Sequence, residues 1–218
     1  MPLTKLDTNA SLVVIDLQKG IVDLPTVHPG AEIVARVARL ARAFRERGLP
    51  VVLVNVTAGA PGRTDAGARK SSFSADWTEL VPELQQQPSD HIVSKQRVGA
   101  FIGTSLNEIL RQRGVTQVFV TGVATSAGVE STVRSAYDYG YNVVTVVDAM
   151  TDRDADRHRH SVESIFPPHE RDGHNRQRAE AAAIRGMRYI DAPMLIFRGF
   201  SRTGDGIGGE TRQDRAAF

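Results

Sequence analysis

Two hydrophobic patterns alternate along the chain. Short runs that are apolar throughout and rich in β-branched residues predict buried strands, and longer segments with apolar residues every three or four positions predict amphipathic helices. The predicted strands span residues 11–16, 50–56, 91–94, 117–121 and 142–147. The predicted helices span residues 31–48, 104–114, 127–140 and 154–165. Strands and helices therefore alternate from the first strand to about residue 167.

Apolar strands separated by helices are typical of a parallel sheet that is covered on both faces. Because the chain shows no internal repeat, we expect a single doubly wound α/β domain over residues 1–167. In such sheets, ligands bind beyond the carboxyl ends of the strands. The candidate functional positions at those ends are Asp16, Gln18, Thr57, Lys95 and residues 122–128.

Composition narrows the class of protein. Of the 218 residues, 41% are hydrophobic and 24% are charged, which suits one soluble domain and excludes disordered and collagen-like chains. No apolar run approaches the roughly 20 residues that span a bilayer, and no apolar signal segment follows the first residues, so we expect a cytoplasmic protein. The chain has no cysteine, which excludes disulfides, thiolate metal sites and a cysteine nucleophile.

Asp16 and Lys95 each come at the end of an apolar run. A buried carboxylate is costly unless it is paired, and lysine is rarely buried without a partner. We therefore expect a carboxylate–ammonium pair at this edge of the sheet. Asp16 is either catalytic or has a structural role as a helix N-cap or a loop acid. The small residues 121–128 precede a predicted helix, whose first N–H groups would face an anion. They form no dinucleotide-binding, Walker or nucleophile-elbow motif.

Two further groups of side chains have structural interpretations. Trp77, Leu80 and Leu84 follow helical spacing, and we expect them in the core or in an interface rather than around a cofactor. His158 and His160 stand two positions apart on the last predicted helix and so point to different faces. We expect these histidines on a solvated face rather than as a pair of metal ligands.

Several segments resemble the isochorismatase-like hydrolases, the cysteine hydrolase superfamily that includes nicotinamidases and carbamoylsarcosine amidases. The matching segments, in the family's order and spacing, are residues 13–18, 95–104, 114–116, 122–125, 129–134 and 147–149. The resemblance covers about residues 10–167. It implies a mainly parallel six-stranded sheet, a small-molecule substrate and a homo-oligomer, either a dimer or a tetramer.

The resemblance also implies an active site. The family's Asp, Lys and Cys map onto Asp16, Lys95 and Gly128, and its cis peptide bond, which helps to form an oxyanion hole, maps onto Val123–Ala124. The candidate substrate-binding residues are Gln18, Thr57, Val123, Ala124, Thr125 and Ser126.

Glycine at position 128 removes the thiol chemistry of the cysteine members, and Ser126 would point elsewhere from its place in the helix entry. True isochorismatases resemble this chain in having glycine there, and they hydrolyse a vinyl ether with Asp as the acid and water as the nucleophile. The resemblance thus implies non-covalent acid–base hydrolysis by Asp16, whose pKa burial would raise and Lys95 would lower. The alternative is a catalytically silent member that binds a small molecule or a partner subunit.

The family also bears on substrate and metal. Isochorismatases have an aromatic residue and a histidine where this chain has residues 124–126, so we expect either a smaller or more polar substrate than isochorismate or no substrate at all. Nicotinamidases bind zinc through an Asp and histidines in the loop after the second strand. The corresponding loop here, residues 57–72, has Asp65 but no histidine, so we expect no metal and no other cofactor.

The end of the chain departs from the family. Residues 1–167 hold 18 Lys and Arg against 18 Asp and Glu, so the net charge of +2 comes from residues 168–218, with 9 Arg against 7 acids. Because acids are interleaved with these arginines, we expect no nucleic-acid binding. Related chains end with a segment that contains Glu-Thr-Ala-Thr-Thr followed by Val-Leu. If the possible codons of residues 168–179 are read one base later, they can encode such an ending. We hypothesise that residues 168–218 are a frameshift product. The alternative is a genuine divergent extension.

Overall fold

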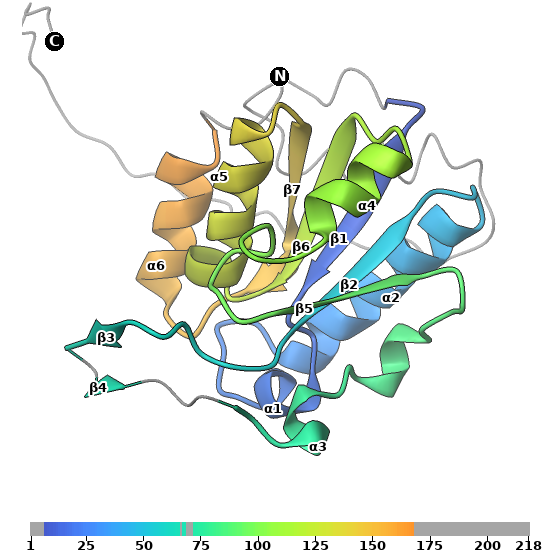
Figure 1. Ribbon diagram of the computed structural model, residues 1–218. Helices are drawn as coiled ribbons and strands as arrows, with labels where there is room; N and C mark the ends of the chain where they lie inside the picture. The colour runs from blue at the N-terminus through green and yellow to red at the C-terminus, as the bar shows by residue number, and fades with distance from the viewer. Residues whose placement is uncertain (1–6, 66, 69–71, 168–218) are drawn as a thin grey trace, which may run out of the picture. The chain divides into compact units, whose positions relative to one another are not determined.

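The protein is a parallel α/β sheet with helices on both faces (Figure 1). The computed structural model describes residues 7–65, 67–68 and 72–167. The five strands of the sheet lie in the order β5-β2-β1-β6-β7, and every neighbouring pair is parallel. Their bounds are β1 Ala10–Ile15, β2 Val51–Val56, β5 His91–Lys95, β6 Gln117–Val123 and β7 Asn142–Thr151. The predicted doubly wound α/β class is therefore confirmed.

Six helices accompany these strands in the described part of the chain. They are α1 Lys19–Val22, α2 Gly30–Arg45, α3 Ala75–Thr78, α4 Leu106–Gln112, α5 Glu130–Asp138 and α6 Ala155–His160. A 3-10 turn covers Pro82–Leu84, and π-helical turns cover Thr125–Val129 and Ser161–Ile165. None of the helices in these residues has the length and apolar character needed to cross a bilayer.

Alternate residues of β1 show why both faces of the sheet are covered. Leu12 and Val14 pack in one core cluster with the apolar face of α2, and Val13 and Ile15 pack in a second cluster with α4 and α5. All four side chains are buried. Burying each one contributes roughly 1.5–3 kcal/mol, so the sheet needs a helix layer on each side. This explains why the strands are apolar throughout rather than alternating.

The strand order places the site. From β1 the chain proceeds to β2 and β5 on one side, and β6 and β7 are added on the other side. The order thus reverses between β1 and β6, which is where ligands bind in open parallel sheets. Asp16 follows β1, Lys95 ends β5, and the loop after β6 begins at Ala124. All three therefore meet at one edge of the sheet.

Several sequence predictions need correction. The described residues form five strands in the main sheet rather than six. The loop after β2 contains a short hairpin, β3 Arg63–Thr64 with β4 Gly67–Ala68, which projects away from the sheet in Figure 1. The helix predicted at 127–140 begins as a π-helical turn, and the helix predicted at 154–165 ends in one. The predicted tail, residues 168–218, lies outside the described residues.

Candidate active site

Asp16 turns the chain out of the sheet. Its N–H still donates to Val54 O (2.9 Å), as in the ladder of β1 with β2, but its own φ of 55° is in the left-handed region. Aspartate tolerates this region better than β-branched or bulky residues do. The turn directs the carboxyl group into a cavity beyond the strand ends, where the residue is only 5% exposed.

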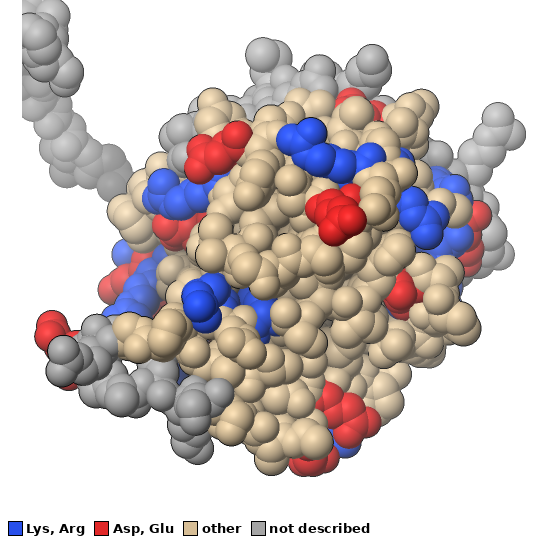
Figure 2. Space-filling view, in the orientation of Figure 1, with Lys and Arg blue, Asp and Glu red and all other residues tan. Residues whose placement is uncertain are grey.

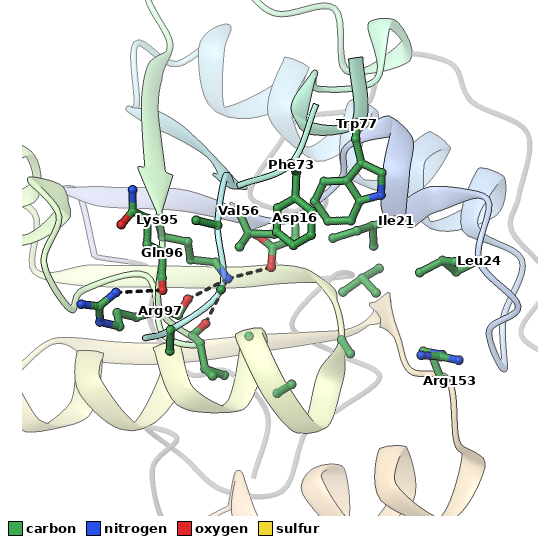
Figure 3. Close-up of a pocket in the computed structure, with 18 of the residues that line it drawn as sticks. Asp16, Ile21, Leu24, Val56, Phe73, Trp77, Lys95, Gln96, Arg97 and Arg153 are labelled. Carbon is green, nitrogen blue, oxygen red and sulfur yellow. Dashed lines mark hydrogen bonds and ion pairs between the residues drawn. The ribbon is translucent and has the colours of Figure 1, made fainter. Parts of the chain in front are cut away.

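Lys95 pairs with this carboxylate across the width of β2. Its Nζ lies 2.8 Å from Asp16 Oδ2, and the residue is 2% exposed. The same ammonium group donates to the carbonyl oxygens of Arg97 (3.3 Å) and Val98 (3.1 Å), as Figure 3 shows. All three donors of the ammonium group thus have acceptors, which fixes its position beside Asp16. The expected carboxylate–ammonium pair is therefore present.

Burial has the larger effect on Asp16. It raises the pKa of this carboxyl group from 3.8 to about 6, although the ion pair and hydrogen bond with Lys95 act in the opposite direction. The second oxygen, Oδ1, is buried and has no hydrogen-bond partner in the described part of the chain. A carboxyl group with a pKa near neutrality can give or take a proton at working pH, so Asp16 suits acid–base chemistry.

Gly128 lies directly against Asp16. It is buried in the π-helical turn after β6, and its carbonyl accepts a hydrogen bond from Thr132 Oγ1 (2.6 Å). A Cβ built onto Gly128 would lie 3.2 Å from Asp16 Oδ2 and 2.9 Å from Ile15 Cγ2. A cysteine side chain here would therefore start beside the carboxylate. The peptide bond Val123–Ala124, at the start of this turn, is cis, as the family resemblance implies.

A cavity of about 540 Å³ opens above this pair (Figure 3). One wall is aromatic, because Phe73 and Trp77 stack with ring centroids 4.0 Å apart. Two guanidinium groups, from Arg97 and Arg153, lie toward opposite ends of the view with Asp16 between them. In the space-filling view of Figure 2, a group of blue Lys or Arg side chains near the middle of the face has no red neighbour. Asp16 is the only acid among the described residues that line the cavity, so the cavity carries excess positive charge.

The predicted site residues divide into two groups. Asp16, Lys95, Gly128, Val123 and Ala124 line the cavity together. The cavity lining does not include Gln18, Thr57, Thr125 or Ser126.

Gln18 and Thr57 instead connect backbone segments. Gln18 is fully buried: its Nε2 donates to Val56 O and Trp77 O (3.1 Å each), and its Oε1 accepts from Val56 N (2.8 Å). The N–H of Thr57 donates to Lys95 O (2.9 Å). Both residues thus hold the strand ends on which the site is built.

Thr125 and Ser126 make contacts behind the cavity. Thr125 Oγ1 lies 2.8 Å from His158 Nδ1, and Ser126 N donates to Asp152 Oδ2 (2.7 Å). His158 is consequently half-buried, which corrects the prediction of a solvated histidine, while His160 is exposed.

Sequence reasoning missed part of the cavity lining. Of Trp77, Leu80 and Leu84, which their spacing predicts to lie in the core or in an interface, only Leu84 is fully buried in the core. Trp77 lies on a single helical turn and lines the cavity. Arg97 could have been found, because it stands two residues after Lys95 in a matching segment. Arg153 stands two residues beyond β7 and shows no comparable signal. The residues that the structure describes contain no cluster of three or more potential metal ligands.

Comparison with known proteins gives consistent matches. The isochorismatase domain matches residues 10–171. The uncharacterized isochorismatase family protein YwoC of Bacillus subtilis is 38% identical over 164 residues, which cover 72% of this chain and 85% of that protein. Ureidoacrylate amidohydrolase RutB of Pseudomonas syringae is 30% identical over 178 residues, covering 68% of this chain and 73% of the relative. The structure of an isochorismatase family protein from Burkholderia thailandensis has a TM-score of 0.74 at 41% identity, covering 78% of this chain and 92% of the other.

Proposed function

The chain belongs to the isochorismatase family, and from this premise we propose that it hydrolyses a small anionic metabolite by non-covalent acid–base chemistry at Asp16. The family includes hydrolases, among them the amidohydrolase RutB. The observation that carries the proposal is the buried Asp16–Lys95 pair on the cavity floor, next to a glycine where a thiol would stand. The pair supplies a proton donor, and because Gly128 has no thiol, water is the nucleophile in this proposal.

The proposed step follows from the pKa of Asp16. The protonated carboxyl group gives its proton to the alkene carbon of a vinyl ether, and an oxocarbenium ion forms. Water adds to this cation and returns a proton to the Asp16 carboxylate. The resulting hemiketal then breaks into a carbonyl compound and an alcohol, and the enzyme is unchanged. A pKa of about 6 keeps both forms of Asp16 accessible near neutral pH, which the cycle requires.

Lys95 has two roles in this proposal. Its ammonium group fixes the orientation of the Asp16 carboxyl group through the 2.8 Å contact. Its positive charge also stabilises the carboxylate that forms when Asp16 gives up its proton. Because both side chains are buried, this charge acts more strongly than it would on the surface.

The charge and shape of the cavity support a small anionic substrate. Arg97 and Arg153 both line the cavity. Asp16, the only acid among the described residues that line it, is already paired with Lys95. Arginine presents a planar fork of donors that matches a carboxylate. The stacked rings of Phe73 and Trp77 provide a flat apolar wall for an unsaturated part of the substrate.

A catalytically silent binding protein is the second candidate. It is favoured by the lack of nucleophilic side chains, because Thr26 carries the only hydroxyl group among the described residues that line the cavity. Such a protein would keep the charged cavity and bind an anionic metabolite without converting it.

Substrate screening with paired variants tests the proposal. We would assay the full chain against carboxylate-bearing vinyl ethers, amides and carbamates, together with Asp16→Asn and Lys95→Ala. Removing a general acid costs roughly 10²–10⁴-fold in rate, so both variants should lose any activity found. Asp156→Asn and Lys19→Ala are matched controls, because Asp156 is exposed and Lys19 is partly exposed and lies outside the cavity lining. Both controls should keep full activity.

The outcomes separate the two candidates. Activity that survives in Asp16→Asn would remove the acid–base proposal. If no compound is turned over but carboxylates protect the wild-type protein against thermal unfolding, the binding protein is favoured. Unfolding curves of every variant show whether a lost activity reflects a lost fold.

A further inference from the structure

Two histidines lie against each other behind the cavity, where three chain segments meet. His28 lies between α1 and α2, and His158 lies on α6. Their ring centroids are 5.1 Å apart at an interplanar angle of 69°. His158 Nδ1 is also 2.8 Å from the hydroxyl oxygen of Thr125, the first residue of the π-helical turn. None of these three residues lines the cavity, so the proposed reaction gives them no direct part.

Backbone contacts draw the same segments together. Val27 N donates to Asp152 O (2.8 Å), and His28 N donates to Thr151 Oγ1 (3.0 Å), so the segment after α1 is fastened to the end of β7. The carboxylate of Asp152 in turn accepts the N–H of Ser126 (2.7 Å) in the π-helical turn. The two histidines therefore sit in a junction between the segment at residues 23–29, the turn at 124–129 and α6.

Both of the joined segments form walls of the cavity. Leu24 and Thr26 contribute from the first segment, and Ala124, Ala127 and Gly128 contribute from the second. A change at the junction would therefore move cavity walls that stand on either side of the reacting groups. We propose that His28, His158 and Thr125 are positioning residues, which hold these two walls together and which separate when His158 is protonated. The effect of this separation on catalysis rests on the proposed function, whereas its effect on the shape of the cavity does not.

The surroundings of His158 explain why a proton would open the junction. Burial lowers the pKa of His158 from 6.5, the neighbouring His28 lowers it further, and Asp152 acts in the opposite direction. Both Asp152 oxygens already accept backbone N–H groups, from Ser126 on one side and from Arg153 (2.8 Å) on the other. The remaining charged residues of these segments are exposed, namely Asp23, Arg153, Asp154, Asp156, Arg157, Arg159 and Glu163, except that Glu130 is half-buried and accepts a hydrogen bond from Ser161 Oγ (2.7 Å).

The ring of His28 offers no carboxylate to an added charge. Its Nδ1 is buried and has no hydrogen-bond partner in the described residues. A proton on His158 therefore places a positive charge in the contact between the two imidazole rings, where the Asp152 carboxylate already accepts backbone N–H groups. The folded junction favours neutral His158, so we expect it to loosen as the pH falls below the ordinary histidine pKa of 6.5.

Trp77 offers a test that needs no substrate. It is the only tryptophan of the chain and lines the cavity, so its fluorescence quenching by acrylamide reports how open the cavity is. We would measure the quenching constant at about pH 7.5 and about pH 5.5, on either side of the histidine pKa. Two variants test the hydroxyl group of Thr125: Thr125→Val deletes it and Thr125→Ser keeps it. His158→Asn keeps a hydrogen-bond acceptor at position 158 but cannot be protonated. His160→Asn is the matched control, since His160 is exposed on the same helix.

The expected pattern is specific. The wild-type quenching constant should rise roughly twofold on acidification, as a minor open state becomes populated. His158→Asn should lose this rise, Thr125→Val should show the open value at both pH values, and Thr125→Ser and His160→Asn should behave as the wild type. The proposal is overturned if His158→Asn keeps the full rise or if Thr125→Val matches the wild type. If Thr125→Val does not fold, the proposal is decided by comparing the quenching of His158→Asn with that of the wild type.

Failure of the proposed reaction is distinguishable from failure of this junction. If Asp16→Asn keeps activity while the quenching pattern holds, the junction stands and the reaction does not. If a substrate is found, Thr125→Val should raise its KM more than it lowers kcat, because the walls that hold the substrate move while Asp16 and Lys95 stay in place.

Discussion

At the scale of single residues, the site depends on a competition between burial and pairing at Asp16. The sequence indicates that Asp16 and Lys95 both end apolar runs, and from this their pairing can be predicted. It does not indicate which effect dominates the pKa, because that depends on how deeply the carboxyl group is buried. The structure shows that burial dominates. The role of Gly128 could be predicted only through the family resemblance, since glycine has no side chain to suggest a function.

The raised pKa of Asp16 predicts the pH dependence of the reaction. If protonated Asp16 is the acid, kcat should be constant at low pH and fall above about pH 6, by about tenfold for each further pH unit. The sign follows from the direction of the shift, because the reactive protonated form is lost as the pH rises through the folded-state pKa. A pH–rate profile of the wild-type protein checks this. A rate that instead increases through pH 6 would make Asp16 a base.

The position of Gly128 predicts how an introduced thiol would behave. Because the wild type has no cysteine, iodoacetamide should label only Gly128→Cys, and the nearby Lys95 ammonium should favour its thiolate. Adding Lys95→Met should therefore slow the labelling of Gly128→Cys. Ala127→Cys, at the exposed neighbouring position in the cavity, is the control and should be much less affected. Equal slowing of both thiols would place residue 128 away from the ion pair.

At the scale of elements, regular helices could be predicted and irregular turns could not. The helix predicted at 31–48 is found as α2, because its apolar positions Ile33, Val37 and Leu40 repeat with the period of an α-helix. The turn Thr125–Val129 has π-helical hydrogen bonds, for which the sequence has no period. Trp77 follows helical spacing, yet α3 ends one residue later, so the spacing was misleading. The cavity walls belong mainly to such irregular segments.

The start of α5 predicts a stability effect that can be measured. Thr132 Oγ1 donates to Gly128 O (2.6 Å) and accepts from Ala100 N (3.1 Å), and Thr132 is fully buried. Thr132→Val keeps the shape but leaves both backbone groups without this partner, so we expect a loss of about 1–3 kcal/mol in the free energy of unfolding. Thr132→Ser keeps the hydroxyl group and should lose less. Urea unfolding of the two variants makes the comparison, and an equal loss would show that the methyl group of Thr132 contributes as much as its hydroxyl group.

At the scale of the whole molecule, the order of strands could not be deduced from the residues alone. Their alternation with helices favours a parallel sheet, but the order β5-β2-β1-β6-β7 depends on how the layers pack. That order decides which strand ends meet. It explains why Arg153, which follows the edge strand β7, reaches the same cavity as Lys95, which ends the opposite edge strand.

The frameshift that we propose for residues 168–218 makes a prediction about the gene. Sequencing across the Pro167 codon should show a one-base change relative to close relatives, and its reversal should restore an ending of the family type. Such a change of frame would also account for the end of the balanced charge at residue 167. An intact frame without such a change would instead support the divergent extension.

The two members of the ion pair come from strands that are not adjacent in the sheet, and this affects when the site forms during folding. Asp16 follows β1 and Lys95 ends β5, and β2 lies between them. The chain therefore closes loops of many residues before these charges meet, and pairings between distant positions form slowly. A partly folded chain that lacks β5 carries Asp16 without its cation. The proposed catalytic site is therefore complete only when β5 has paired with β2, and it is lost when this edge strand opens.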